Sequence, residues 1–271
     1  MGFEAHYTKD GVLFIRKSMI EDYTFCPYRF KKTWIDNMTK RANQIMIIGT
    51  RFHDFANTFF DYCGAYPPEY WDHFVPKEFI EEEQKMALWF INYERERLAE
   101  LTAEGKADHW MPVMREVRMK SEAMFLEGTC DRIDWYNREK EQVRIIEYKT
   151  GNSINDVSLT RQLAFYSILW QDTMGQSGEV AALRVIAPRI GVVKDYKVDN
   201  WQTDRVMKDV VALRKAIREG KFPAKCSEIK CAMCKTCSPI EAGVSAGDIA
   251  RYADYVDPKD PNFRFSDIYR Y

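Results

Sequence analysis

The sequence predicts an α/β fold in which a mixed sheet is flanked by helices and preceded by a helical N-terminal part. Residues 18–105 follow a helical pattern that Gly64, Pro67 and Pro68 interrupt. From residue 110 onward, short segments rich in β-forming residues alternate with polar turns. A helical segment then separates this strand-rich region from two further strands, an order that is typical of a mixed α/β sheet.

The helical part is expected to contain three helices, at 18–35, 44–62 and 77–103. The third is long, charged and amphipathic, and Gly105 follows it as a helix-ending residue. Strands are expected at 113–119, 123–126, 131–136 and 143–148. A helix at 155–170, two strands at 182–186 and 192–198, and a helix at 201–219 complete the core.

These elements predict one domain over residues 1–271. It comprises a helical part at 18–105, an α/β core at 110–220, a cysteine-rich segment at 221–240 and a tail at 241–271. A chain of this length can bury a substantial core as one elaborated domain.

The composition is that of a globular protein, with 46% hydrophobic and 30% charged residues and a formal net charge of -1. We expect no membrane association, because no apolar stretch approaches the length of a bilayer span. The first residues lack the pattern of a secretory signal, so a cytoplasmic location is expected. A balanced charge does not exclude nucleic acid as a partner, since basic side chains can be confined to one groove.

A carboxylate and an ammonium stand together at the end of an apolar run, where Glu147 and Lys149 follow Ile145 and Ile146. Strand alternation places both charged side chains on one face, and Asp131 supplies a second carboxylate. Taken alone, Glu147 and Lys149 would be an ordinary surface pair. Beside apolar residues, however, such charges are costly unless they are paired or bound to an ion. The pattern therefore predicts a site that binds a hard divalent cation next to a phosphate whose negative charge increases during the reaction. Such a site is typical of metal-dependent cleavage of phosphodiester bonds.

Four motifs together resemble the active-site core of the PD-(D/E)XK nuclease superfamily. They are Gly128-x-x-Asp131-Arg-Ile-Asp134, the run 145–151 around Glu147-Tyr148-Lys149, Gln162-x-x-x-Tyr166, and an upstream helical histidine, His53. The last two are similar to the RecB-type exonuclease branch, which includes CRISPR-associated and phage-encoded exonucleases. Gln162 and Tyr166 are one helical turn apart and share a face.

The resemblance implies a restriction-endonuclease-like sheet and roles for the motif residues. Asp131, Glu147, His53 and the backbone carbonyl of Tyr148 would hold Mg²⁺ or Mn²⁺, and the imidazole favours Mn²⁺. Lys149 would position the attacking water or stabilise the pentavalent transition state. Gln162 and Tyr166 would orient Lys149 or hold the DNA backbone. Two further acids are less specific: Asp134 is expected to make a structural or supporting contact, and Glu116 is a weaker site candidate.

The chain has seven cysteines, of which four form Cys226-x4-Cys231-x2-Cys234-x2-Cys237. Without a secretory signal, this clustering predicts a metal site rather than disulfides. A zinc site that uses all four local thiolates is one option. The resemblance implies another, a structural [4Fe-4S] cluster held by Cys26, Cys231, Cys234 and Cys237, with Cys226 as an alternative ligand. The short gap before Cys237 departs from the family pattern. Cys63 and Cys130 are expected to be buried small hydrophobes.

The resemblance implies a metal-dependent DNA exonuclease that acts on single-stranded ends in DNA repair, recombination or processing. A structure-specific endonuclease or DNA-trimming nuclease is an alternative within the enzyme class. The alternative from another class is a non-cleaving DNA-binding or scaffold subunit of a nuclease-helicase complex. A helicase or recombination protein is an expected partner, because the chain has no phosphate-binding loop of the Gly-x-x-x-x-Gly-Lys-Ser/Thr type.

Overall fold

The computed structural model describes residues 7–37, 44–174, 178–197 and 200–225. The chain divides into two compact units, one formed by residues 1–40 and 208–271 and the other by residues 41–207. The prediction of one domain over the whole chain stays a prediction.

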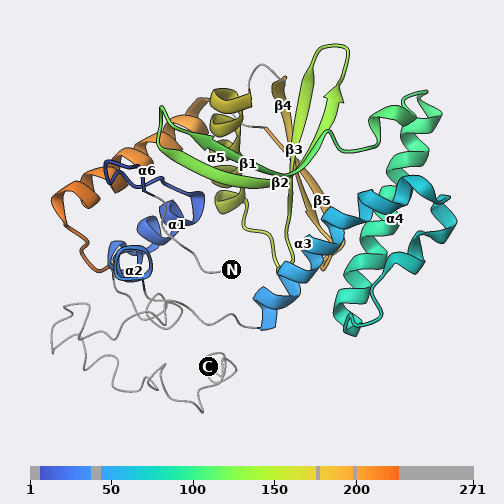
Figure 1. The fold of residues 1–271 in the computed structure, drawn as a ribbon, viewed down its shortest axis with the longest axis horizontal. Helices are drawn as coiled ribbons and strands as arrows, with labels where there is room; N and C mark the ends of the chain where they lie inside the picture. The colour runs from blue at the N-terminus through green and yellow to red at the C-terminus, as the bar shows by residue number, and fades with distance from the viewer. Residues whose placement is uncertain (1–6, 38–43, 175–177, 198–199, 226–271) are drawn as a thin grey trace. The chain divides into compact units, whose positions relative to one another are not determined.

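The larger unit is built on a five-stranded sheet in the order β1-β2-β3-β4-β5. The strands are β1 (Met114–Ser121), β2 (Leu126–Asn137), β3 (Gln142–Tyr148), β4 (Glu179–Ala187) and β5 (Val192–Tyr196). Neighbouring strands are antiparallel except β3 and β4, which are parallel and are joined through α5 (Asp156–Met174). A mixed sheet with helices beside it confirms the predicted fold class (Figure 1).

Helix α5 packs closely on β2 at Gly128. A Cβ atom at this glycine would lie 3.1 Å from Cε1 of Tyr166, 3.2 Å from Cδ1 of Leu169 and 3.3 Å from Cε1 of Phe165. The absence of a side chain at Gly128 therefore lets the helix that carries Gln162 and Tyr166 approach the sheet.

The second helical layer of this unit contains α3 (Gln44–Tyr62) and α4 (Glu81–Ala103). Their side chains form an aromatic core with Ile146 and Tyr148 of β3, in which Phe52 and Phe90 contact the Tyr148 ring edge-on. Alternation along β3 turns Ile146 and Tyr148 toward this core and Glu147 toward α5. Figure 1 shows α5 and α4 on opposite sides of the strands.

Short 3₁₀ helices connect these elements: η2 (Cys63–Ala65), η3 (Pro68–Phe74) and η4 (Ala107–His109). Helix α4 begins at Glu81 instead of residue 77, because Ile80 is extended and its N–H donates to the Glu83 carboxylate at 2.8 Å. This cap satisfies one of the N–H groups that a helix start leaves without a partner.

The two strands predicted at 123–126 and 131–136 are wrong as separate elements. Residues 122–125 form the turn between β1 and β2, and one strand then runs from Leu126 to Asn137. Gly128 lies within this continuous strand, where it allows close packing of α5.

The smaller unit contains α1 (Lys17–Phe25), α2 (Pro27–Phe30) and the π-helical η1 (Lys31–Ile35). The single helix predicted at 18–35 is interrupted at Cys26, which is extended because it precedes Pro27. Helix α6 (Asn200–Glu219) follows β5 in the chain. Within the described part of the chain, no helix combines the length and apolar character needed to cross a membrane.

Candidate functional site

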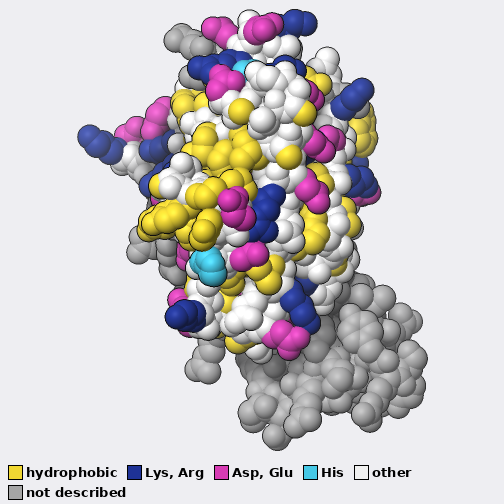
Figure 2. Space-filling view, turned by 90° about the vertical axis from the view of Figure 1, so that its right-hand side faces the viewer, with side chains coloured by type: hydrophobic (Ala, Val, Ile, Leu, Met, Phe, Trp, Pro, Cys, Tyr) yellow, Lys and Arg dark blue, Asp and Glu magenta, His cyan; other side chains and the backbone are white. Residues whose placement is uncertain are grey.

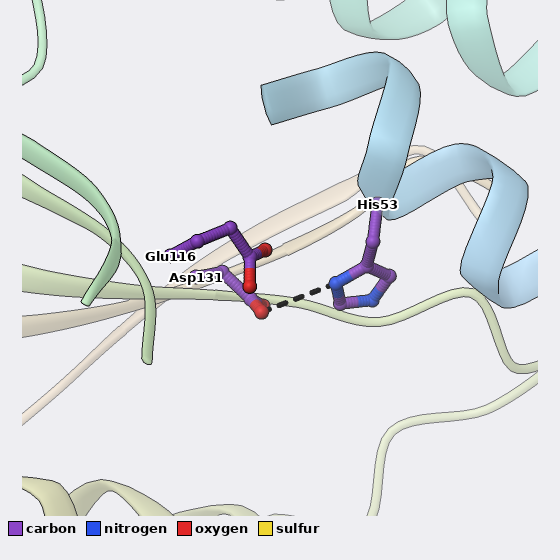
Figure 3. Close-up of side chains that lie close together, drawn as sticks. All are labelled: His53, Glu116 and Asp131. Carbon is purple, nitrogen blue, oxygen red and sulfur yellow. Dashed lines mark hydrogen bonds and ion pairs between the residues drawn. The ribbon is translucent and has the colours of Figure 1, made fainter. Parts of the chain in front are cut away.

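Three side chains from three different elements of the larger unit converge at one point. His53 of α3, Glu116 of β1 and Asp131 of β2 each offer a ligand atom, and these atoms all lie within 4.8 Å of one another. Figure 3 shows the two carboxylates and the imidazole turned toward a common space. One nitrogen and several carboxylate oxygens form a donor set that suits Mn²⁺ or Mg²⁺.

Asp131 contacts two other elements of the site through its two carboxylate oxygens. Its Oδ1 lies 3.1 Å from Nδ1 of His53, and its Oδ2 accepts a hydrogen bond of 2.6 Å from the Tyr148 backbone N–H. The His53 ring also packs edge-on against the Tyr148 ring, with centroids 5.8 Å apart. Asp131 thus joins α3 to β3, and the carboxylate is fixed before any ligand binds.

Glu116 reaches the cluster through an interruption of the β1–β2 ladder. Arg115 pairs with Arg132 and Val117 pairs with Cys130, so Glu116 stands opposite Asp131 in the register. Its backbone is left-handed, with φ of 48°. A non-glycine residue in this region costs free energy and is typical of functional sites. The weaker candidate from the sequence is therefore a full member of the observed cluster.

A second group of predicted residues lies on the α5 side of β3. The Lys149 ammonium donates to Oε1 of Glu147 at 2.7 Å and to Oε1 of Gln162 at 2.8 Å. The Gln162 amide donates to the same Glu147 oxygen and contacts the Tyr166 hydroxyl at 3.2 Å. Glu147, Lys149, Gln162 and Tyr166 therefore form one connected network of hydrogen bonds.

The other oxygen of Glu147 has no such partner. Glu147 is 5% exposed, and Oε2 is buried without a hydrogen bond in the described structure. An unpaired buried carboxylate oxygen is costly unless it meets a proton or a cation. The Glu147 side chain therefore fits a role as a metal ligand.

The pKa values of His53, Glu116 and Glu147 are raised, in part because several carboxylates lie close together at this site. Burial alone would lower the pKa of His53, but the Asp131 carboxylate outweighs burial and raises it to about 9. Partial burial together with Asp131 raises the pKa of Glu116 to about 7. Burial, reinforced by Asp131, also raises the pKa of Glu147 despite the nearby Lys149 ammonium. Such shifts are expected where several carboxylates share a site.

Asp134 belongs to a different, structural network. Its carboxylate accepts two hydrogen bonds of 2.6 Å from Arg132 and pairs with Arg97 at 3.1 Å. Arg132 also pairs with Glu94 of α4 at 2.6 Å, and its Nη1 lies 3.4 Å from the Tyr148 hydroxyl. The four charged side chains are all nearly or fully buried. The expected structural contact of Asp134 is therefore present, and it links α4 to the strand that carries Asp131.

Of the predicted cluster cysteines, only Cys26 lies within the described residues. It is 4% exposed, and its sulfur accepts a hydrogen bond of 3.4 Å from the backbone N–H of Lys225. The chain thus returns to Cys26 one residue before Cys226. Cys226, Cys231, Cys234 and Cys237 lie outside the described residues. Cys63 and Cys130 are buried, as expected of small apolar residues.

Sequence patterns alone ranked Glu116 below the other acids of the site and did not indicate Glu94 or Arg97. The correct β1–β2 turn would have revealed Glu116, because the register then places it opposite Asp131. Glu94 and Arg97 are three residues apart in a charged helix, a pattern that also describes solvent-exposed pairs. Only tertiary packing shows that they are buried.

Charge is mixed on the face drawn in Figure 2. Lys and Arg side chains are interspersed with Asp and Glu, and apolar side chains gather between them. The described part of this face therefore carries no continuous basic stripe, in keeping with the net charge of -1.

Comparisons with known proteins give one family match. A family model described as the PD-(D/E)XK nuclease superfamily matches residues 17–238. No curated protein matches the sequence. A matching solved structure is the crystal structure described as "Putative exonuclease" from Eubacterium rectale, with 12% identity, a TM-score of 0.47, and coverage of 95% of this chain and 93% of that chain.

Proposed function

Because the chain belongs to the PD-(D/E)XK nuclease superfamily, we propose that it is a metal-dependent deoxyribonuclease of the RecB-type exonuclease branch. In this proposal it hydrolyses phosphodiester bonds from single-stranded DNA ends. Superfamily membership makes it a nuclease; the exonuclease activity, the preference for DNA ends and the dependence on Mg²⁺ or Mn²⁺ are the proposal.

The unpaired Oε2 of Glu147 is the observation that carries the proposal. It belongs to a buried carboxylate on the strand next to Asp131, whose own carboxylate already contacts His53. A cation would satisfy the open oxygen and offset the repulsion between these acids. His53, Glu116, Asp131, Glu147 and the Tyr148 carbonyl are the proposed ligands.

When bound, the cation would supply Lewis acidity and a bound water of lowered pKa. Lys149 is the proposed group that faces the scissile phosphate and stabilises the charge that develops there. Its ammonium is held by Glu147 and Gln162, so the charge is positioned before substrate arrives. Gln162 in turn contacts the Tyr166 hydroxyl, which supports a positioning role for both α5 residues.

We also propose that Cys26 helps to hold a structural [4Fe-4S] cluster, with Zn²⁺ as the alternative. The buried sulfur of Cys26 fits this role, because a backbone N–H from the segment just before Cys226 already reaches it. The test is elemental analysis of protein purified without oxygen. Iron with acid-labile sulfide in wild type and its loss in Cys26→Ser support the cluster, whereas stoichiometric zinc without iron would reject it.

The proposed substrate is DNA with free ends, and a helicase or recombination protein is the proposed partner in repair or recombination. The experiment that tests end dependence compares linear and circular single-stranded DNA of one sequence in Mn²⁺. Degradation of the linear strand alone is expected. Cleavage of both forms at equal rates would favour the endonuclease alternative, and binding without cleavage of either would favour the scaffold alternative.

A further inference from the structure

A cavity of about 480 Å³ lies at the start of α4, outside the network of proposed catalytic residues. Its lining comes from the first turns of α4 and from the segment after β4: Ile80, Glu81, Glu82, Lys85, Met86, Pro188 and Arg189. All of these residues belong to the larger unit. The cavity is mixed in character, with two acidic and two basic side chains.

Arg189 is the unusual residue in this lining. Its side chain is 9% exposed, and its Nη1 pairs with Glu82 at 3.0 Å and donates to Oδ1 of Asn152 at 3.1 Å. Its Nε and Nη2 are buried and have no hydrogen-bond partner. In the described part of the chain, no other side chain contributes two such atoms.

Nε and Nη2 form the edge of a guanidinium that binds an oxyanion through two parallel hydrogen bonds. This protein uses that edge twice elsewhere: Arg132 binds Asp134 with it at 2.6 and 2.6 Å, and Arg184 binds Asp195 at 2.6 and 2.8 Å. Arg189 presents the same edge with no carboxylate on it. Two buried donors without an acceptor are costly, so a ligand with two oxygens is the chemical complement.

The position of Arg189 connects this edge to the proposed catalytic strand. Asn152, its hydrogen-bond partner, is three residues after Lys149, which corresponds to at most roughly 10 Å of extended chain. Helix α3 meets the same loop, because a Cβ at Gly49 would lie 2.9 Å from Oγ1 of Thr150. Gly49 is one helical turn before His53. Arg189 in the cavity wall is therefore connected to Lys149 through the loop that carries Asn152, and this loop also contacts the helix that carries His53.

We propose that Arg189 binds a backbone phosphate of the nucleic-acid strand in this cavity, next to the strand that carries Lys149. The proposal rests on the proposed nuclease function. Glu82, whose side chain is 45% exposed, pairs with Nη1 of the same guanidinium, and its negative charge repels a phosphate bound at Nε and Nη2. Glu82 therefore weakens phosphate binding while Arg189 supports it, so changes at the two positions have opposite effects.

The test is binding of a fluorescent single-stranded oligonucleotide in EDTA, where hydrolysis cannot occur. Arg189→Met is expected to weaken binding about tenfold, as for a lost charge-assisted hydrogen-bond pair. The slope of log affinity against log salt should fall by about 0.7, which corresponds to one phosphate contact. Glu82→Gln is expected to tighten binding about twofold. Because impaired folding cannot explain tighter binding, Glu82→Gln distinguishes a direct effect on phosphate binding from a loss of folded protein.

Matched controls lie at the other end of α4. Glu104→Gln and Lys106→Met remove the same charges beyond the last turn of a 23-residue helix, about 30 Å away along its axis and several Debye lengths distant. Neither should change the affinity. Equal affinities for wild type and Arg189→Met, or a loss in Lys106→Met as large as in Arg189→Met, would overturn the proposal.

A second titration separates this proposal from the nuclease proposal. Inorganic phosphate at millimolar concentrations, followed by calorimetry, should bind wild type and not Arg189→Met, even if DNA is never cleaved. Cleavage of DNA by a protein whose Arg189→Met variant binds oligonucleotide normally would leave the nuclease function intact and reject the phosphate site. Absence of both phosphate and oligonucleotide binding in wild type would also reject it.

Discussion

Nδ1 of His53 lies 3.1 Å from Oδ1 of Asp131, which joins a helix and a strand 78 residues apart in the chain. Asp131 faces three other charged groups, His53, Glu116 and Glu147, two of which are acids. The site therefore gathers negative charge around one imidazole before any cation binds.

Asp131→Asn is expected to lower the affinity for Mn²⁺ by at least about tenfold, because it removes a proposed ligand carboxylate that lies at the centre of the site. The unfolding temperature without metal should change little, since the decreased repulsion with Glu116 and Glu147 is offset by the lost ion pair with His53. Calorimetric titration with Mn²⁺ measures the affinity. Asp54→Asn is the control, because it removes the same charge from the exposed side chain next to His53. Equal Mn²⁺ affinities for Asp131→Asn and wild type would contradict the assignment.

Gln162→Leu is expected to reduce the cleavage rate about 10- to 100-fold, since it removes the amide that orients both Lys149 and Glu147. Tyr166→Phe should have an effect of only a few fold, because it removes a single contact of 3.2 Å. Rates under single-turnover conditions in Mn²⁺ give the comparison. A larger loss in Tyr166→Phe than in Gln162→Leu would show that Tyr166 acts on the substrate directly.

Gly128→Ala is expected to destabilise the protein by about 1–3 kcal/mol. The added methyl would lie 3.1 Å from the Tyr166 ring and 3.2 Å from Leu169, which tightens the contact between α5 and β2. Gly64→Ala is the matched control, because no atom lies within 4 Å of its added Cβ. Urea unfolding measures both. Equal free energies of unfolding for the two variants would contradict the prediction and would mean that α5 shifts to make room for the added methyl group.

Asp134→Asn is expected to destabilise the protein by about 3–5 kcal/mol at neutral pH, because Arg132 and Arg97 lose a buried carboxylate. Burial would raise the Asp134 pKa, but the two arginines outweigh it and hold the pKa below its usual value. A lowered pKa in the folded state stabilises the protein above the unfolded pKa, and this contribution is lost as the pH falls through the folded pKa. The difference between variant and wild type should therefore be full at pH 7 and shrink below about pH 4.

Urea unfolding at several pH values tests this dependence. Asp108→Asn, at an exposed ion pair with Arg138, is the control and should change the free energy of unfolding by less than about 1 kcal/mol. A difference for Asp134→Asn that grows in acid would contradict the predicted sign.

Local sequence patterns predict the fold class and the proximity of Glu147 to Lys149 and of Gln162 to Tyr166, whereas the approach of His53 to Asp131 was implied only by the family resemblance. Alternation alone placed Glu147 and Lys149 on one face, and helical spacing placed Gln162 next to Tyr166. Glu116 depends instead on the β1–β2 register, which the mistaken strand at 123–126 obscured. The buried network around Arg132 and the buried, unpaired edge of Arg189 depend on tertiary packing between residues far apart in sequence, which no local pattern predicts.

The metal-dependent nuclease function is best tested by the cleavage rate of end-labelled single-stranded DNA in Mn²⁺, compared between wild type, Glu147→Gln and Lys149→Ala. Wild type should cleave the DNA, EDTA should stop the reaction, and each variant should lose at least about 100-fold in rate while its unfolding temperature remains close to that of wild type. Equal cleavage by all three proteins would contradict the assigned roles of Glu147 and Lys149, and cleavage that persists in EDTA would contradict the dependence on a metal ion.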